Sequence, residues 1–373
     1  MHLENAVMVP FIPGLDLAET LYRDAVAPIL ARDFPDLPYS AALLGTGSDV
    51  LGFDTPRSMD HGWGPRLLLF VGEDQDGLAG AIERTLRVTL PRDVAGVSTH
   101  FVPTEEAGIS RLGPVPPGED EVNHGVTVST LARFVAAHLG CPADADLDVV
   151  DWLCCTDQGL RAVTAGRVFH DGLETLGSLR QRLAYYPDPL WRHLLAAQWK
   201  RISQHEAFVG RAGEVGDERG SALVAAGLVR DAMRLCFLMG RTYAPYEKWF
   251  GRAFSLLGGA PALELLLDDA LVARTWEARD LAMGRVYERL ATMHNDLGIT
   301  PPLSVGARPY WDRPYRVIHA ERFVAAIRAT ITDPATLALP PGLGSLDQIV
   351  DSADLLTHPR RRAMCAYLYG DGG

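Results

Sequence analysis

The hydrophobic pattern of this chain changes once along its length, and this change limits the folds that are open to it. In residues 1–172, short apolar runs such as 39–45 and 66–72, which end in glycine as buried strands often do, alternate with helical patterns such as 15–32. In residues 173–373 the pattern is helical almost throughout. The expected architecture is an α+β domain, with a small mixed sheet and flanking helices, followed by an all-α helical domain.

Further segments complete the expected first domain. The pattern predicts a helix over residues 77–90, a strand over 96–102, and a short strand that runs into a helix over 126–140. Residues 103–125 are rich in proline, glycine and acidic side chains and have no periodicity. This composition indicates an irregular surface segment.

Charge and composition argue against several classes of protein. The 373 residues include 35 basic and 47 acidic side chains, and the net charge of -12 disfavours binding of duplex nucleic acid by a general basic surface. No run approaches the ~18 apolar residues of a membrane span, and no basic segment leads into an apolar one at the start, so we expect a cytoplasmic protein. Five cysteines without a C-x-x-C pair indicate reduced, mostly buried thiols.

Residues 45–71, GTGSDVLGFDTPRSMDHGWGPRLLLFV, contain the strongest candidates for chemistry. Gly47 and Ser48 follow an apolar run, and a turn of this kind presents backbone amides and one hydroxyl to phosphate oxygens. We expect Asp60 to begin the next strand beside this loop, where its carboxylate can hold Mg²⁺ against the phosphates. The alternative is a long connection between two strands, in which Asp60 caps a turn beside His61.

This stretch resembles the signature of the nucleotidyltransferase-like proteins of the polymerase-beta superfamily, in which Gly-Ser is followed by an acid-x-acid pair. More narrowly, GFDTPRSMDHGWGPR, TAGRVFHD, YYPDPLW, GRAGEVGDERGSALVAAGLVRDAMRL and YAPYEKWFGRAF resemble a bacterial family of such proteins with a helical C-terminal domain. The resemblance covers nearly the whole chain. It implies transfer of a nucleoside monophosphate from a nucleoside triphosphate to a small hydroxyl or amino acceptor, with Mg²⁺, in a cleft between the two domains.

Individual residues have expected roles, and those of Gly47, Ser48 and Asp60 are what the resemblance implies. The expected contacts of the triphosphate are Gly47, Ser48, Arg66 and Lys248. Asp60 and Asp54 are the expected metal ligands, and Asp60 and Ser48 are the expected catalytic residues. The partners implied are thus a nucleotide, a small-molecule acceptor and Mg²⁺.

The chain departs from this signature at the acids. The second acid is expected two residues after Asp60, on the same side of a strand, and that position is Gly62. The third acid is expected from a later strand, and the predicted strands contain none. Carboxylates near these segments in the sequence are Asp49, Asp54, Glu105 and Asp151. The alternative function is therefore a degenerate nucleotidyltransferase fold that binds a nucleotide or a protein without turnover. A nucleic-acid-modifying enzyme is a third alternative, which the acidic charge disfavours.

Three further segments have two interpretations each. Lys248, one of only two lysines, lies between aromatic residues and is either a triphosphate contact or a solvated surface lysine. The charged residues of 211–219 form either a loop that binds acceptor or phosphate, or a self-paired structural loop. The tyrosines and tryptophans of 185–191 and 242–249 are either core residues or a base-stacking surface.

Overall fold

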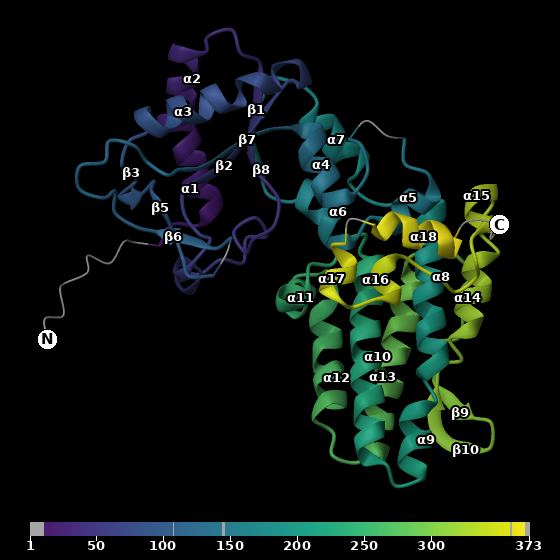
Figure 1. The fold of residues 1–373 in the computed structure, drawn as a ribbon. Coiled ribbons are helices and arrows are strands. Elements are labelled where there is room, and N and C mark those ends of the chain that lie inside the picture. The colour runs from purple at the N-terminus through teal and green to yellow at the C-terminus, as the bar shows by residue number, and fades with distance from the viewer. Residues whose placement is uncertain (1–10, 107, 144–145, 359, 370–373) are drawn as a thin grey trace, which may run out of the picture. The chain divides into compact units, whose positions relative to one another are not determined.

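The computed structural model describes four stretches of the chain, which are residues 11–106, 108–143, 146–358 and 360–369. The chain divides into two compact units, whose elements are labelled in Figure 1. The first, called the sheet unit below, comprises residues 1–145 and 159–184, and the second, called the helical unit, comprises residues 146–158 and 185–373. The chain therefore passes between the units three times, whereas the sequence pattern predicts a single boundary after residue 172.

A long helical segment opens the sheet unit (Figure 1). It consists of α1 (Gly14–Leu21), a π-helical turn (Tyr22–Val26) and α2 (Ala27–Asp33). The apolar residues at helical spacing form its buried face, which is made by Leu17, Leu21, Val26, Ile29 and Leu30. The helix predicted over residues 15–32 is therefore confirmed, with a π-helical turn in its middle.

Four strands form the main sheet of this unit, in the order β7-β2-β1-β8. They are β1 (Tyr39–Leu43), β2 (Arg66–Val71), β7 (Gly125–Thr130) and β8 (Arg167–Asp171). β2 and β7 are parallel, and β1 is antiparallel to both β2 and β8, so the sheet is mixed, as predicted. Because Ala42 pairs with Leu68, the end of β1 lies beside the start of β2. The connection 44–65 thus leaves and re-enters the sheet at one edge.

Helices flank this sheet, as the sequence predicts. They are a 3₁₀ turn (Glu73–Leu78), α3 (Ala79–Thr89), α4 (Leu131–Leu139), α6 (Asp157–Thr164) and α7 (Leu176–Arg182). Ile82 and Leu86 of α3 belong to the same buried apolar cluster as Leu67 and Leu69 of β2. The β1–β2 connection packs on another cluster, in which its Val50 contacts Ala18 of α1 and Leu43 of β1.

Two small ribbons stand outside the main sheet, between α3 and β7. They are β3 (Asp93–Val94) with β4 (Val97–Ser98), and β5 (Phe101–Pro103) with β6 (Ser110–Leu112). The prediction of one strand over residues 96–102 is therefore wrong. The chain bends in the middle of that segment, because Thr99 bonds back through its hydroxyl to the Pro91 carbonyl and through its amide to the Arg92 carbonyl.

Helices make up most of the helical unit. They are α5 (Val149–Cys154), α8 (Asp188–His205), α9 (Phe208–Glu214), α10 (Glu218–Met239), α11 (Glu247–Phe254), α12 (Ala260–Val272), α13 (Trp276–Asp296), α14 (Glu321–Arg328), α15 (Pro334–Ala338), α16 (Leu346–Ile349), α17 (Ala353–Leu356) and α18 (Arg361–Tyr369). In its core the fully buried ring of Trp199, from α8, stacks on Phe323, from α14, with centroids 4.2 Å apart. His294 of α13 packs edge-on against the same Phe323 ring. Aromatic packing therefore joins three helices at this point.

The helical unit also contains a β-hairpin, so the prediction of an all-α second domain is wrong in this detail. β9 (Arg308–Tyr310) pairs with the antiparallel β10 (Arg313–Val317). Tyr315 of β10 is fully buried against Gly210 of α9, where a side chain on the glycine would collide with the tyrosine ring. Strands this short offer too few residues for their alternation to be recognised in the sequence.

Two expectations from composition can be compared with the structure. All five cysteines are buried, in agreement with the prediction of mostly buried thiols. Among the described stretches, no helix combines the length and the apolar composition that crossing a membrane requires.

Candidate functional site

The turn that follows β1 is the first part of the candidate site. The Leu51 amide donates to the Gly47 carbonyl at 3.3 Å, and the Phe53 amide donates to the Ser48 carbonyl at 2.7 Å, so the chain folds back on itself directly after the strand. Because β1 and β2 are antiparallel neighbours, this turn lies at the sheet edge where β2 begins with Arg66. Gly47, Ser48 and Arg66 therefore belong to one edge of the sheet.

Gly47 adopts a conformation that only glycine accommodates here. Its φ angle is +146°. A Cβ atom at this position would collide with the carboxylate of Asp49 and would approach Nη2 of Arg66 to 3.2 Å. The absence of a side chain at Gly47 therefore lets both charged groups pack against the turn.

A buried ion pair ties this turn to β2. Arg66 Nη2 donates to Oδ2 of Asp49 at 2.5 Å, and Oδ1 of Asp49 accepts the Val50 amide at 3.0 Å. The side chain of Asp49 is 4% exposed and that of Arg66 is 28% exposed. Because a carboxylate this deeply buried needs a charged partner, the pair fixes the guanidinium beside the turn.

Several hydrogen-bond donors at this turn have no protein partner. Within the part of the chain that the structure describes, the amides of Gly47, Ser48 and Asp49 donate to no other residue. Nε of Arg66 is buried and is also without a partner there. Successive backbone amides beside a guanidinium are the kind of donor group that binds phosphate oxygens. The turn and Arg66 together therefore offer an anion a set of open donors.

Asp54, a predicted metal ligand, has a structural partner. Its Oδ2 accepts the amide of Gly14, the first residue of α1, at 2.7 Å. A carboxylate at the start of a helix satisfies a free amide and is stabilised by the helix dipole. Asp54 thus anchors α1 to the β1–β2 connection, and its role at a metal stays a prediction.

Asp60 is not on a strand, which corrects the sequence interpretation. It ends a short 3₁₀ helix, Pro56–Asp60, and β2 begins only at Arg66. The helix forms because Thr55 and Ser58 make a capping box, in which the Ser58 hydroxyl accepts the Thr55 amide at 3.1 Å. Positions 60 and 62 therefore do not lie on the same face of a strand, as the acid-x-acid signature would require.

The carboxylate of Asp60 is exposed and pairs with His61. Its Oδ1 lies 3.0 Å from Nδ1 of His61 and accepts the His61 amide at 2.9 Å. Although loss of hydration opposes the effect, these contacts hold the pKa of Asp60 below its ordinary value. The side chain is 59% exposed and ionised at neutral pH, so it is open to a cation. Gly62, the expected position of the second acid, has a φ angle of +64°, which favours glycine.

The carboxylates of this region do not form a metal-binding cluster. Among the residues that the structure describes, no three His, Cys, Asp or Glu side chains are arranged to hold a metal ion. Each of the three acids of the loop has the protein partner given above. Asp151 belongs to the helical unit, where it caps α5 and accepts from Nε of Arg362 at 2.5 Å, and Glu105 is exposed. This arrangement does not fit a site built for two metal ions.

Lys248 and the aromatic residues around it lie in the helical unit. Lys248, in α11, is exposed, and its ammonium lies 5.2 Å from the ring centre of Trp249. Three tyrosines pack ring against ring with centroids 5.0 to 5.2 Å apart, and they are Tyr185, Tyr186 and Tyr243. The core interpretation is therefore confirmed for Tyr186 and Tyr243, which are buried, while contact of Lys248 with a triphosphate stays a prediction.

The charged residues of segment 211–219 are used mainly within the fold. Asp217 is the N-cap of α10 and accepts the Gly220 amide at 2.8 Å. Glu214 pairs with Arg313 of the β-hairpin. These contacts support the structural interpretation of the segment.

Sequence reasoning missed two contacts of the site. The pairing of Asp49 with Arg66 joins residues seventeen positions apart across the β1–β2 connection, and no motif marks it. The bond from Gly14 to Asp54 joins α1 to the same connection. The 3₁₀ helix before Asp60 was also missed, although Thr55 followed by Pro56 is a local signal for the start of a helix.

Comparisons with known proteins add little about the activity. Residues 152–250 match a family model described as a domain of unknown function, DUF4037. The matched segment contains α8 and α10 and does not include the Gly47 turn. The searches of curated proteins and of solved structures return no match to this chain.

Proposed function

We propose that the sheet unit binds a nucleoside triphosphate at the turn of Gly47, Ser48 and Asp49, and acts as a nucleotide-binding module with a nucleotidyltransferase-like fold. The observation that carries the proposal is the set of open donors at this turn, which are three backbone amides and Nε of Arg66. Proteins bind phosphate oxygens with donors of these two kinds. The resemblance of residues 45–71 to the nucleotidyltransferase signature supports the same ligand.

Arg66 has enough donors to serve both Asp49 and a phosphate. A guanidinium carries five N–H groups in a fixed plane, and the contact with Asp49 uses Nη2. The buried Nε and the remaining amino group are left for the ligand. The carboxylate of Asp49 opposes binding, because it is an almost fully buried negative charge beside the same amides.

Nucleotidyl transfer catalysed by two metal ions is less compatible with this geometry than nucleotide binding without a reaction. That chemistry needs several carboxylates that converge on the same ions. The acids of the loop are held apart by different partners, namely Arg66 for Asp49, the Gly14 amide for Asp54 and His61 for Asp60. We therefore favour a module without turnover.

Nucleotidyl transfer is the second candidate function, and one observation favours it. The carboxylate of Asp60 is ionised and 59% exposed, and it stands where the signature has its first acid. The reaction would move a nucleoside monophosphate to a small hydroxyl or amino acceptor. A single carboxylate would hold Mg²⁺ weakly, since this ion keeps most of its waters unless several oxygen ligands replace them.

Calorimetric titration with ATP and GTP, with and without Mg²⁺, tests the proposal. We expect binding in the absence of Mg²⁺, and about tenfold weaker binding in Arg66→Lys, which keeps a cation for Asp49 but removes the Nε donor. Arg57→Lys, an exposed arginine of the same connection, is the matched control and should bind like the wild type. The proposal would be contradicted if neither ATP nor GTP binds to the wild type, either with or without Mg²⁺.

Two further variants separate the module from the transferase. In Asp49→Asn the opposing charge is gone, so Mg²⁺-free binding should tighten, whereas a metal ligand at this position would make Mg²⁺-dependent binding weaker. Asp60→Asn should leave the affinity of the module unchanged. If Asp60→Asn instead abolishes Mg²⁺-dependent binding, and the wild type releases pyrophosphate when an acceptor is added, transfer replaces binding as the function.

A further inference from the structure

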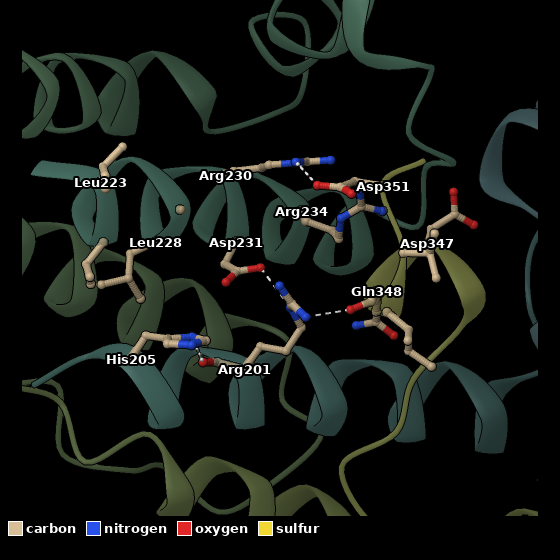
Figure 2. A pocket seen from close by; sticks show the side chains of 14 residues that line it. Arg201, His205, Leu223, Leu228, Arg230, Asp231, Arg234, Asp347, Gln348 and Asp351 are labelled. Carbon is tan, nitrogen blue, oxygen red and sulfur yellow. Dashed lines mark hydrogen bonds and ion pairs between the residues drawn. The ribbon is translucent and has the colours of Figure 1, made fainter. Parts of the chain in front are cut away.

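A groove in the helical unit has the size of a small-molecule site. It lies between α8 and α10 and is bounded at one end by residues 347–351 (Figure 2). Its volume is about 460 Å³, within the ~300–1,000 Å³ typical of ligand pockets. Figure 2 shows Arg201 of α8 reaching toward α10, where it donates to Asp231 at 3.0 Å, and it also donates to the Gln348 carbonyl at 2.6 Å.

One face of α10 forms a wall of this groove. Leu223, Gly227, Arg230 and Arg234 follow one another at intervals of four, three and four residues, which places them on the same side of the helix. Gly227 stands in the interior of α10, where glycine is less favourable than alanine. A Cβ atom added to it would meet no other atom within 4 Å. The glycine therefore leaves open space in the middle of the groove.

Arg234 gives the clearest indication of a ligand. Its side chain is only 14% exposed, and its ion pair with Asp157 spans 3.9 Å, which is too long for a hydrogen bond. Its other contact is with the ring of Phe250, 5.8 Å from the guanidinium carbon. Among the described residues, none accepts a hydrogen bond from this guanidinium. Because Arg234 lines the groove and its donors have no protein acceptor there, the space beside it is suited to an anionic group.

Arg230 is a second cation at this end of the groove. It pairs with Glu247 at 2.7 Å and with Asp351 at 3.3 Å, and both carboxylates are more than 70% exposed. Exposed ion pairs of this kind contribute little and exchange readily. An incoming anion can therefore replace Asp351 at Arg230. Arg201, in contrast, is committed to Asp231, whose side chain is 9% exposed.

Asp347 is the remaining acid at the charged end. Its Oδ2 accepts the Asp157 amide at 2.9 Å. Burial, together with the nearby negative charge of Asp157, raises the pKa of Asp347 to about 7. The raised pKa favours the neutral form of Asp347, which opposes an anion less than an ionised carboxylate does.

The opposite end of the groove is mainly apolar. It is lined by Leu223, Val224 and Leu228 of α10, with His205 of α8 near Leu228, and Leu223 is 69% exposed. Leu223 and Arg234 are eleven residues apart on one helix, which corresponds to about 16 Å along its axis. The groove therefore has a cationic end and an apolar end that are separated by the length of an extended small molecule.

We propose that this groove binds a small organic anion with an elongated apolar body. The carboxylate or phosphate group of the ligand lies between Arg234 and Arg230, and its body lies along Gly227 toward Leu223. The site is contained within the helical unit and does not depend on nucleotide binding at the Gly47 turn. Either proposal can therefore fail without the other.

The first test is calorimetric titration of the full chain with decanoate, using decanol as an uncharged probe of the same length. We expect decanoate to bind saturably at one site and decanol to bind at least about tenfold more weakly, because it lacks the charged group for Arg234. Equal affinities, or no saturable binding at millimolar decanoate, would overturn the proposal.

Two matched pairs of variants locate the site. Arg234→Gln should weaken decanoate binding by about tenfold to a hundredfold, and Arg219→Gln, on α10 outside the groove, should not change it. Gly227→Leu should block the groove, whereas Gly251→Leu, at another open helical glycine, should bind normally. Gly227→Leu decides the matter if Arg234→Gln does not fold, and unchanged binding in Gly227→Leu would refute the proposed position.

Discussion

The Gly47 turn of the sheet unit and the groove of the helical unit handle charge in opposite ways. At the turn, Asp49 is 4% exposed and bonded to Arg66 at 2.5 Å, so the two charges are fixed by each other. In the groove, Arg230 and Asp351 are 3.3 Å apart and 40% and 73% exposed, and the less exposed Arg234 has an ion pair of 3.9 Å. At the turn the two charges are thus committed to each other and the open donors are backbone amides and Nε of Arg66, whereas in the groove the charged groups themselves are loosely paired.

This difference shows why a recognisable motif and an available site are distinct properties. The turn resembles a known phosphate-handling signature, yet its acids each have a protein partner. The groove has no motif, yet it leaves a largely buried guanidinium without an acceptor among the described residues. Both regions leave donors open, and an open donor is a stronger indication of a ligand than residue spacing, because a donor without a protein acceptor can bond to a ligand.

The largest expected effect tests whether the two ion pairs differ as described. Arg66→Gln leaves the Asp49 carboxylate buried without its cation, and we expect a loss of about 3 kcal/mol or more in the free energy of unfolding. Arg230→Gln breaks exposed pairs and should cost less than about 1 kcal/mol. Urea denaturation measures the free energy of unfolding of both variants. Equal losses in the two variants would show that the ion pairs of the turn and the groove do not differ as described.

The next effect concerns the backbone of the turn. Gly47→Ala puts a Cβ atom into the Asp49 carboxylate at a φ angle of +146°, and we expect a loss of about 2 kcal/mol. Gly52→Ala is the matched control, because Gly52 also has a positive φ, +71°, but its added Cβ meets nothing within 4 Å. A loss of about 1 kcal/mol is expected there from the backbone alone. Thermal unfolding that gives equal losses would show that the turn is not tightly packed.

The elements that the sequence predicted well are those with several repeats of one pattern. The helix over residues 15–32, the strands at 39–45 and 66–72 and the helix over 77–90 each bury a regular set of apolar side chains, so local pattern and tertiary packing agree. The β-hairpin at 308–317 has strands too short to show alternation. In the segment 96–102 the tertiary bonds of Thr99 bend an otherwise strand-like run.

The candidate sites could be predicted only where they are local. The Gly47–Ser48 turn is visible because a strand, a glycine and a hydroxyl follow one another in the chain. The partners of its carboxylates come from other elements, so their engagement could not be foreseen. The groove is beyond sequence reasoning for the same reason, because Arg201, Arg234 and Asp347 come from distant parts of the chain and no pattern links them.

The two units should also differ in their response to pH. In the helical unit, burial raises the pKa of Glu206 and of Asp280 to about 6, although backbone amides bonded to each carboxylate oppose the shift. In the sheet unit, hydrogen bonds from the Ser40 hydroxyl and the Gly177 amide outweigh burial and lower the pKa of Asp171. A raised carboxyl pKa favours folding at low pH, and a lowered one favours folding at higher pH.

The sign of each contribution to stability follows from the pKa of the carboxyl group in the folded protein compared with its pKa in the unfolded chain. The stabilisation by Glu206 and Asp280 is complete below their unfolded pKa values and is lost as the pH rises through about 6. When the pH is lowered from 7 to 5, the free energy of unfolding of the helical unit should therefore increase by about 1 kcal/mol per group. The contribution of Asp171 is constant in that window and falls only at lower pH. Hydrogen exchange of peptides from α13 and β8 measures the two responses. Glu206→Gln should remove part of the gain, and parallel responses of α13 and β8 would contradict the contrast.

The smallest expected effect uses one substitution with opposite results in the two regions. At Gly227, in the interior of α10, alanine lowers the entropy of the unfolded chain and its methyl group meets no atom within 4 Å, so Gly227→Ala should stabilise the protein by about 0.5–1 kcal/mol. The same change at Gly47 destabilises the protein, because the added methyl group would collide with the Asp49 carboxylate. Urea denaturation gives both values.

If Gly227→Ala is stabilising and also weakens decanoate binding, the glycine is retained for the space it leaves to a ligand, although alanine would be more favourable in the helix. If it destabilises the fold, the groove is not open, and the contrast between the two regions fails at this residue.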